Sequence, residues 1–310
     1  MTIPQLEYIV ALDTTRHFSK AAALCFVTQP TLSMQIQKLE GELGLEIFDR
    51  SRQPVKPTST GLEIIAKARE MLNILKHIPE IADAAKGQLV GTFRLGIIPT
   101  IAPALLARFL RKFVQHYPLV KLEIEDMQTS ELVEALRSDR LDAGVAAIPL
   151  KERAIKEEHL YFEPFVAFVP THHPKEDDDF ILQAELDIND ILLLQQGHCF
   201  RNNIINLCGK PKKDIHSLTL NSGNFETLVR LSKKGFGMTL LPYLTALGLS
   251  KNDRMRVKPL DDPKPSRQVG LIYSRSQAKK RMLEALRETI QTSLPKILMD
   301  LDDPNVTSPI

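Results

Sequence analysis

Apolar positions in residues 18–39 follow two short helical periods, separated by a tight turn at residues 26–28. In the first helix, the small residues Ala21 and Ala22 permit close helix approach, and Ser19 is the expected N-cap. The second helix has an apolar stripe that recurs at i, i+4 and i+7 and should face inward. That stripe consists of Leu32, Ile36 and Leu39. The pattern predicts a pair of helices joined by a short turn.

The outward face of the second helix carries short hydroxyl and amide side chains, together with one lysine. Such side chains suit base edges and phosphates in a DNA major groove, although an ordinary helical hairpin also has a polar outer face. Pro30 stands in the first helical turn, where proline is tolerated. The candidate DNA-contacting residues of this helix are Gln29, Pro30, Thr31, Ser33, Gln35 and Lys38.

A short basic segment follows the second helix. From Arg50 to Leu62 the chain has three basic residues, no acidic residue and two prolines that stiffen it. A hairpin after a helix-turn-helix is a wing, and this one would place Arg50, Arg52 and Lys56 beside the DNA backbone or minor groove. A solvated surface would carry such charges too, and residues 1–60 as a whole hold six basic and six acidic side chains.

Residues 61–86 have the apolar periodicity of one long amphipathic helix. Its stripe consists of Ile64, Ala68, Met71, Leu75 and Ile78. Pro79 is expected to kink or end this helix, and Gly87 to close it. Because the helix has no partner within its own segment, a second copy of the chain is expected to bury the stripe. The pattern predicts a dimer.

The order of these motifs resembles that of LysR-type transcriptional regulators, and the resemblance covers nearly the whole segment. It implies a winged helix-turn-helix DNA-binding domain at residues 1–60 and a linker and dimerisation helix at residues 61–89. The matching residues are Ala21-Ala22, Val27-Thr28-Gln29-Pro30-Thr31-Leu32-Ser33, Leu39-Glu40, Leu43-Gly44, Phe48-Asp49-Arg50, Pro57-Thr58 and Thr60-Gly61.

From Gly91 onward, strand and helix patterns alternate, which predicts an α/β architecture. Strands are expected at 93–98, 120–125, 142–148, 165–169, 191–194, 217–220 and 269–273, and helices at 102–116, 130–139, 225–234 and 276–293. The family resemblance implies a regulatory domain at residues 90–300 with two subdomains, similar to periplasmic binding proteins. The expected limits are 90–162 with 268–300 for subdomain I, 163–267 for subdomain II, and 301–310 for a flexible tail.

Composition excludes several classes of protein. With 43% hydrophobic and 25% charged residues, the chain is neither mostly disordered nor fibrous. Its apolar runs fall short of the ~20 residues of a membrane span, and its first residues lack the pattern of a secretory signal. Three cysteines are too few for a disulfide scaffold, so a cytoplasmic protein with reduced thiols is expected. The net charge of +2 does not identify a partner.

Hydroxyl side chains stand at two predicted strand-to-helix junctions. Thr100 precedes the helix at 102–116, and Thr129 precedes the helix at 130–139. Such residues commonly act as N-caps, but a helix N-terminus at a strand end also offers free N–H groups to a small polar ligand. The sequence therefore predicts either two helix caps or a polar pocket between the subdomains.

The cysteines differ in their surroundings. Cys25 lies between apolar residues and is expected to be a buried apolar side chain. Cys199 lies between His198 and Arg201, whose positive charges would stabilise a thiolate and make the sulfur nucleophilic. Cys208 follows nine residues later. In a straight helix that separation spans roughly 13 Å, so a disulfide would require the intervening segment to refold.

Two other interpretations of this cysteine pair stay open at the level of the residues. The two cysteines could be unrelated to each other. They could also form a metal site with His198 and His216, although the spacing lacks the close pair of cysteines common in zinc sites.

Within a LysR-type chain, the residues around this pair closely resemble the OxyR group of hydrogen-peroxide sensors. The matching residues are Pro99-Thr100, Gln128-Thr129, His198-Cys199, Arg201, Cys208 and Gly237-Met238-Thr239-Leu240-Leu241-Pro242. The resemblance implies that Cys199 attacks peroxide to form a sulfenic acid, which Cys208 resolves as a disulfide. The implied peroxide pocket consists of Thr100, Thr129, His198 and Arg201. Residues 202–211 depart from the best-known members of the group.

We therefore expect a cytoplasmic homodimer or homotetramer that senses hydrogen peroxide, binds double-stranded operator DNA and activates oxidative-stress genes with RNA polymerase. The expected switch is a reversible disulfide between Cys199 and Cys208, with no cofactor, no metal ion, no membrane partner and no enzyme activity. One alternative is a LysR-type regulator that binds a small organic anion in the subdomain cleft. Another is a thiol peroxidase, which would not need the winged helix-turn-helix. A solute-binding protein is disfavoured because no signal peptide is visible.

Overall fold

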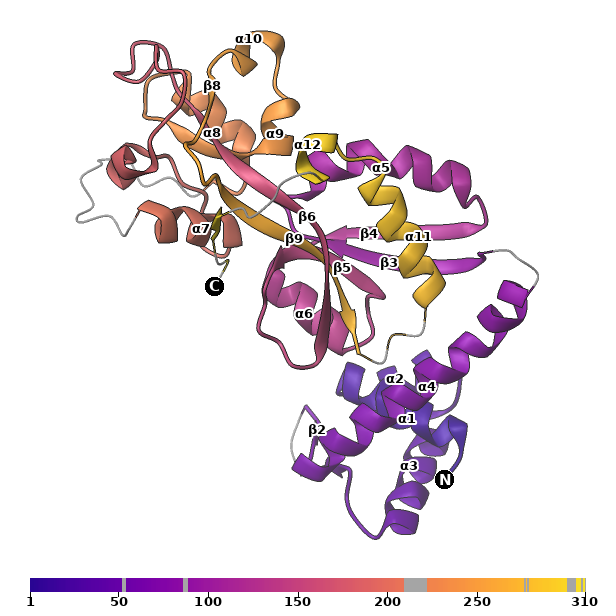
Figure 1. Cartoon of the computed structure of the whole chain (residues 1–310). Helices are drawn as coiled ribbons and strands as arrows, with labels where there is room; N and C mark the ends of the chain where they lie inside the picture. The colour runs from indigo at the N-terminus through magenta and orange to yellow at the C-terminus, as the bar shows by residue number, and fades with distance from the viewer. Residues whose placement is uncertain are drawn as a thin grey trace. The chain divides into compact units, whose positions relative to one another are not determined.

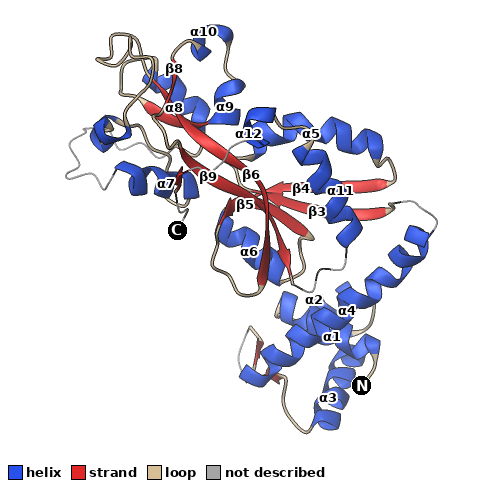
Figure 2. Ribbon diagram, in the orientation of Figure 1, coloured by secondary structure: helices blue, strands red, loops and turns tan. Residues whose placement is uncertain are grey.

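A computed structural model of the chain describes residues 1–51, 54–85, 89–208, 222–275, 277, 279–299, 305–307 and 309 (Figure 1). The chain forms two compact units, residues 1–88 with 276–278 and residues 89–275 with 279–310. The first unit is mainly helical, whereas the second contains a mixed sheet flanked by helices (Figure 2). The expected architecture, an N-terminal helix-turn-helix domain followed by an α/β domain, is confirmed.

The first unit is a winged helix-turn-helix continued by a long helix. Its elements are α1 (Ile3–Thr15), α2 (Phe18–Leu24), α3 (Gln29–Leu43), the antiparallel strands β1 (Phe48–Asp49) and β2 (Lys56–Pro57), and α4 (Ser59–Ala85). The predicted stripe of α3 is buried in one core with apolar residues of α1 and α4. Burying that stripe fixes α3 against the unit and leaves its polar face outward.

One local prediction in this unit is wrong, and one alternative of another is excluded. Ser19 does not cap the first short helix, because α2 already begins at Phe18 and its N-cap is His17. A hydroxyl N-cap is found instead at the next helix, α3, where the Thr28 hydroxyl accepts a hydrogen bond from the Thr31 N–H at 3.4 Å. Pro79 does not end α4, which continues to Ala85, since a proline removes one backbone donor without always ending a helix; the alternative of a kink stays a prediction. Gly87 lies outside the described residues.

The second unit is built on strands that follow the order β4-β3-β5-β9-β6-β7, with β10 paired to β9 and β8 to β6. Strand β3 is parallel to β4 and β5, whereas β9 is antiparallel to β5 and β6. The strands are β3 (Gly91–Ile97), β4 (Val120–Asp126), β5 (Ala143–Ile148), β6 (Ile155–Phe168), β7 (Thr239–Pro242), β8 (Val257–Pro259), β9 (Pro265–Ser274) and β10 (Asn305–Val306).

Helices cover both parts of this sheet (Figure 1). They are α5 (Ala102–His116), α6 (Thr129–Arg137), α7 (Cys199–Cys208), α8 (Phe225–Ser232), α9 (Tyr243–Leu247), α10 (Lys251–Arg254), α11 (Lys280–Gln291) and α12 (Lys296–Met299), with short 3-10 turns at Gln183–Glu185 and Ile188–Asp190. Their apolar faces divide between two separate cores. We call the core around α5, α6 and α11 core I and the core around α8 and β7 core II.

Strands β6 and β9 run from core I into core II. Residues 155–164 of β6 pair with β9, and residues 165–168 pair instead with β7 and β8. The chain therefore leaves core I near residue 164 and returns near residue 265, close to the limits expected for an inserted subdomain. Strand β6 passes the first crossing without a break, and β9 begins at the second.

Several segments of this unit differ from their predictions. The apolar run 191–194 forms no strand, because only Ile191 makes an isolated bridge, with Met238. Strands β7 and β8 and the first half of β6 were not predicted, and the predicted strand 217–220 lies outside the described residues. In the tail expected to be flexible, 301–310, the described residues include β10, which pairs with β9, and a buried Pro309, whereas Asn305 and Val306 are exposed.

Candidate functional site

The sulfur of Cys199 lies at the boundary between the two cores. Cys199 is the first residue of α7 and packs in core I, whereas the next residue, Phe200, packs in core II. Its side chain is buried and is hydrogen-bonded to the hydroxyls of Thr100 and Thr129 and to the backbone N–H of Phe200. Two threonines from separate strand-to-helix junctions therefore meet at one sulfur atom.

Neither threonine caps a helix with its hydroxyl. Helix α5 has Ile101 as its N-cap, and α6 begins at Thr129 itself with Gln128 as its N-cap. Of the two interpretations that the sequence allowed, helix caps and a polar pocket, the caps are excluded by this geometry. Both hydroxyls are directed to the sulfur instead.

The loop before α7 is held against the start of α6. Gly197 has φ +95, a left-handed conformation that favours glycine. A Cβ at this position would lie 2.5 Å from Oε1 of Gln128, so any side chain would have to displace the Gln128 amide. Glycine at residue 197 thus lets the loop pack against the Gln128 side chain at the start of α6.

A buried arginine, Arg267, organises the other side of the sulfur. Its side chain is 1% exposed, and its Nη2 lies 2.7 Å from Oε2 of Glu163, which is equally buried. Its Nη1 donates to the Thr100 hydroxyl and its Nη2 to the Thr100 carbonyl, both at 3.0 Å. The guanidinium also lies 5.4 Å from the centre of the Phe200 ring. Arg267 therefore fixes Thr100 where it can contact the sulfur.

The protonation of Cys199 results from opposing effects. Burial raises the pKa of the Cys199 thiol, because a thiolate is poorly solvated in an apolar interior. The positive charge of Arg267 opposes that rise, followed by hydrogen bonds from Thr100, Thr129 and the Phe200 N–H. All four opposing groups favour the thiolate, which is the nucleophilic form.

The cations predicted from the sequence have other positions. Burial lowers the pKa of His198, so its neutral form is favoured near neutral pH, and its Nε2 has no hydrogen-bond partner among the described residues. Arg201 donates from Nη1 to the Leu194 carbonyl at 2.9 Å, within the segment that leads to α7. The positive charge that acts on Cys199 comes from Arg267, which was not predicted.

One feature of the sequence could have pointed to Arg267 as a site residue. It is a charged residue just before the apolar run of β9, and Glu163 is its direct cross-strand partner in β6. A buried arginine requires such an anion. Pairing the two charges would have needed the strand register, which the sequence does not provide.

Cys208 lies at the opposite end of α7 from Cys199. Both are free cysteines, and nine helical residues separate them by roughly 13 Å. Burial, with a smaller effect from the Asp187 carboxylate, raises the pKa of Cys208 to about 11. A disulfide between them tolerates only about 4.4–6.8 Å between Cα atoms, so it requires α7 to unwind. Cys25 is half-buried in the first unit, where burial and Glu7 raise its pKa.

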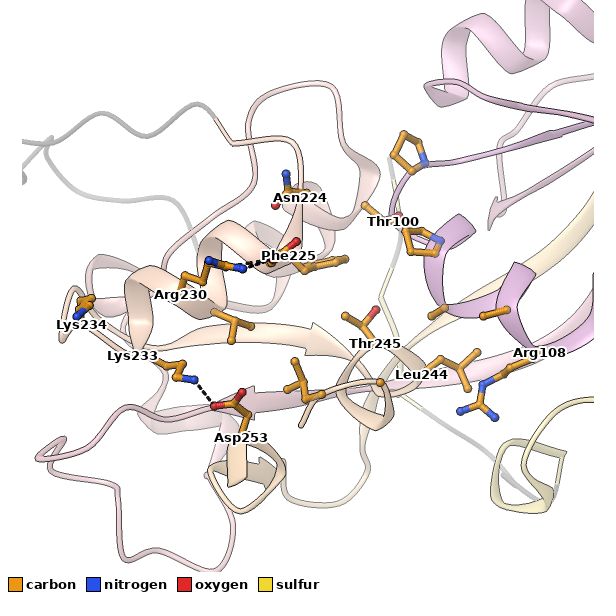
Figure 3. A pocket seen from close by; sticks show the side chains of 18 residues that line it. Thr100, Arg108, Asn224, Phe225, Arg230, Lys233, Lys234, Leu244, Thr245 and Asp253 are labelled. Atoms are coloured by element: carbon orange, nitrogen blue, oxygen red, sulfur yellow. Dashed lines mark hydrogen bonds and ion pairs between the residues drawn. The ribbon is translucent and has the colours of Figure 1, made fainter. Parts of the chain in front are cut away.

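A cleft of about 940 Å³ adjoins Thr100 (Figure 3). The start of α5 forms one wall, and α8 and α9 form the other. The floor is apolar, with Phe225 and Leu244 among its residues. Of the four cationic side chains that line it, Lys233 lies 2.6 Å from Asp253 and Arg230 lies 2.6 Å from Glu226, whereas Arg108 and Lys234 have no acidic partner among the described residues.

The predicted DNA-contacting residues of α3 lie on its outward face to different degrees. Gln29, Pro30 and Lys38 are exposed, whereas Thr31, Ser33 and Gln35 are half-buried. The Thr31 hydroxyl lies 2.8 Å from that of Thr28, and Oε1 of Gln35 accepts a hydrogen bond from Gln5 of α1. In the wing, Lys56 is exposed, and Arg52 lies outside the described residues.

Arg50 is already engaged within the first unit. Its Nη2 lies 2.6 Å from Oε2 of Glu40, and its guanidinium lies 5.5 Å from the centre of the Phe18 ring. The other oxygen of Glu40 accepts the backbone N–H groups of Ile47 and Phe48, at 2.9 and 3.2 Å. Glu40 therefore partly compensates the positive charge of Arg50.

The metal interpretation gains no support in the part of the chain that the structure describes, which contains no cluster of His, Cys, Asp and Glu suited to a metal ion. His216, one of the residues of that interpretation, lies outside the described residues.

Two family descriptions match the chain. "Bacterial regulatory helix-turn-helix protein, lysR family" matches residues 3–62, and "LysR substrate binding domain" matches residues 86–295. Among curated proteins, the "DNA-binding transcriptional dual regulator OxyR" of Escherichia coli K12 is 33% identical over 294 residues, covering 95% of this chain and 96% of that protein. The regulator EstR of Acinetobacter baylyi is 34% identical over 284 residues, covering 89% and 91%.

Solved structures give the same likeness. A full-length OxyR mutant from Pseudomonas aeruginosa has a TM-score of 0.77 at 33% identity, covering 95% of this chain and 99% of that one. A Corynebacterium glutamicum OxyR mutant with bound hydrogen peroxide has a TM-score of 0.63 at 26% identity, covering 99% and 98%. Overall identity does not separate OxyR from EstR as relatives, so the residues around Cys199 must decide between peroxide and another signal.

Proposed function

Because the chain belongs to the LysR family of transcriptional regulators, we propose that it is a DNA-binding activator switched by hydrogen peroxide through Cys199 and Cys208. Several similar curated proteins carry the name "Hydrogen peroxide-inducible genes activator", among them that of Haemophilus influenzae, which is 30% identical over 300 residues. The proposal rests on one observation, the buried Cys199 sulfur held by two threonine hydroxyls beside the Arg267 guanidinium.

The proposed chemistry has two balanced steps. The Cys199 thiolate attacks one oxygen of hydrogen peroxide, the O–O bond breaks, and the leaving hydroxide takes up the proton that the Cys199 thiol released when it ionised, which gives water. Cys199 is then a sulfenic acid. The Cys208 thiolate displaces hydroxide from that sulfur and forms the disulfide, and this hydroxide takes up the proton released by the Cys208 thiol and leaves as a second water. The two thiols lose two hydrogens in total, and peroxide is reduced to two waters.

The residues around the sulfur have distinct proposed roles in the first step. Arg267 and the two threonine hydroxyls favour the thiolate and also offer donors to a leaving hydroxide. His198, in its neutral form, has an unpaired Nε2 that can accept a hydrogen bond from bound peroxide. The second step needs α7 to unwind, and this change is the proposed signal to the DNA-binding unit.

Peroxide titration of the purified protein tests the proposal. Intact-mass measurement should show a loss of two hydrogens in the wild type and no such loss in Cys199→Ser. Cys25→Ser, the matched control, should behave as the wild type because Cys25 lies in the other unit. A wild-type protein whose mass is unchanged at peroxide concentrations that oxidise small thiols slowly would refute the peroxide switch.

The second candidate is a regulator that binds a small organic anion, and the cleft beside Thr100 is the observation that favours it. Two of its cations, Arg230 and Lys233, are paired with acids, which weakens their attraction for an anion, whereas Arg108 and Lys234 are not paired with acids among the described residues (Figure 3). A thiol peroxidase is disfavoured, since the chain carries a family helix-turn-helix domain. Rapid peroxide turnover with a dithiol reductant and no change in DNA binding would favour the enzyme.

The proposed partners are double-stranded operator DNA, a second copy of the chain through α4, a tetramer built from such dimers, and RNA polymerase. In the described residues, no helix combines the length and apolar character needed to cross a membrane. We place the regulator in the cytoplasm because its DNA target and its reduced thiols are both found there.

A further inference from the structure

A short segment near the end of the chain is attached to the helix that carries both cysteines. Strand β10, Asn305–Val306, pairs in parallel with Pro265 and Ser266 at the start of β9. The next residue, Thr307, donates from its backbone N–H to the Ser266 carbonyl at 2.8 Å. We call Asn305–Thr307 together with Pro309 the strap. Figure 1 shows the strap beside α7.

The strap holds α7 through a buried asparagine. Asn203 is fully buried in the middle of α7, and its Nδ2 donates to the Thr307 carbonyl at 2.9 Å and to the Thr307 hydroxyl at 3.2 Å. One residue earlier in α7, Nδ2 of Asn202 lies 3.4 Å from the carbonyl oxygen of Pro309. Both amide protons of Asn203 are thus satisfied by one residue of the strap.

Asn203 would be a poor core residue without the strap. Its Oδ1 has no hydrogen-bond partner among the described residues. If Thr307 moved away, the whole amide would be buried without partners, and such burial is unfavourable. The helical position of Asn203 therefore depends on the strap.

The strap is also hydrogen-bonded to the residue that precedes Arg267, the cation that acts on Cys199. Ser266, which accepts two hydrogen bonds from Thr307, immediately precedes Arg267. Both residues are buried in β9. One short segment therefore connects the middle of α7 to the strand that positions the guanidinium beside the sulfur.

We propose that Asn203 and Thr307 are positioning residues that hold α7 in its helical, reduced form, so that disulfide formation must release the strap. The inference rests on the proposed Cys199–Cys208 switch. Unwinding α7 brings its two ends from roughly 13 Å to disulfide distance, and Asn203, at the centre of that segment, cannot keep its place. The strap stabilises the reduced state only, and it therefore opposes oxidation.

The expected effect is a shift of the redox equilibrium. Losing a buried amide hydrogen bond from only one of two states changes their ratio by about tenfold, which is about 30 mV for a two-electron couple. Asn203→Ala should shift the equilibrium toward the disulfide by about this factor. Alanine is also the strongest helix former, so a gain in helix propensity alone would shift the equilibrium in the opposite direction.

The experiment uses the full-length protein equilibrated in glutathione buffers, with the disulfide measured by intact mass. The variants are Asn203→Ala and Thr307→Val, which removes the strap hydroxyl and keeps its shape. The matched control is Asn305→Ala, since Asn305 lies in the strap but contacts Gln183 rather than α7. Thr307→Val should shift the equilibrium in the same direction by a smaller factor, and Asn305→Ala should leave it unchanged.

Hydrogen exchange provides a readout that does not need the disulfide. In the reduced protein, Thr307→Val should speed the exchange of α7 amides, and in the wild type, oxidation should speed exchange at the Thr307 amide. If the wild type forms the disulfide and both Asn203→Ala and Thr307→Val have the wild-type redox equilibrium, this inference is overturned while the proposed function stands. A wild type that forms no Cys199–Cys208 disulfide would overturn both this inference and the proposed function.

Discussion

Replacing Thr129 by valine removes one hydroxyl from the Cys199 sulfur while keeping the shape of the side chain. Thr129 is the first residue of α6 and does not cap it, so the helix should lose little stability. The variant instead removes one of the hydrogen bonds that favour the thiolate. The pKa of the Cys199 thiol should therefore rise further above that of an ordinary cysteine, and the fraction of Cys199 present as thiolate at neutral pH should fall.

The size of the effect follows from the interaction that is lost. A hydrogen bond to a charged group contributes about 1.5–3 kcal/mol, and about 1.4 kcal/mol corresponds to a tenfold change in a population. Because Thr129 is half-buried, water can replace part of the lost interaction. We expect the low end of the range, a decrease of about tenfold in the rate of Cys199 oxidation.

The assay is the rate of Cys199 oxidation by peroxide as a function of pH, followed by rapid quenching and mass spectrometry. Since burial raises the pKa of Cys199, the rate should keep increasing above neutral pH, and the increase should move to higher pH in Thr129→Val. Alkylation by iodoacetamide reports the thiolate fraction without needing peroxide to be oriented. A larger loss with peroxide than with iodoacetamide would assign Thr129 a second role in placing peroxide.

Two substitutions control this experiment. Thr129→Ser keeps the hydroxyl and should retain most of the rate, and Ser130→Ala removes the exposed neighbouring hydroxyl and should have no effect. Wild-type peroxide kinetics in Thr129→Val would refute the assignment of this hydroxyl to the site, whatever its melting temperature.

Three further outcomes are expected. Cys208→Ser should let Cys199 proceed to sulfinic and sulfonic acids under excess peroxide, and their absence from mass spectra would contradict a resolving role. Ser33→Ala should lose discrimination between operator and random DNA in gel shifts, and equal loss on both would remove Ser33 from the readout of bases. Arg50→Ala should weaken binding to all sequences and reduce its salt dependence, but only slightly, because Glu40 already compensates the Arg50 charge; an unchanged salt slope would exclude a phosphate contact.

Local periodicity predicted α2 to α6, α8 and α11, whereas α1, α7, α9, α10 and α12 were not predicted. The spacing of Leu32, Ile36 and Leu39 gave the buried face of α3, and the predicted helix at 102–116 coincides with α5. Such patterns depend on residues close in sequence, so they survive without knowledge of the tertiary structure. The run at 191–194 shows the limit, since an apolar segment can be buried in core II without forming a strand.

The candidate site was predictable only in part. Thr100, Thr129 and Cys199 were predicted, and the structure brings them together at one sulfur. Arg267 was not, because it acts on Cys199 only through strand register and a buried pair with Glu163. The hydrogen bonds of Thr307 were not predicted, because its partners in α7 and β9 lie far away in the sequence. Long-range pairing of this kind has no local signature.

The crossing of β6 and β9 between the cores has a mechanical consequence. Glu163 and Arg267 face each other where the two strands pass from core I to core II. Any rotation of one core against the other would pivot about these strands, and points on a pivot move least. Cys199 packs in core I with α6, whereas α7 from Phe200 onward packs in core II, so such a rotation would act on the backbone between these two residues. A rotation of the cores would thus reach the sensor at the first turn of α7, within the segment that disulfide formation must unwind.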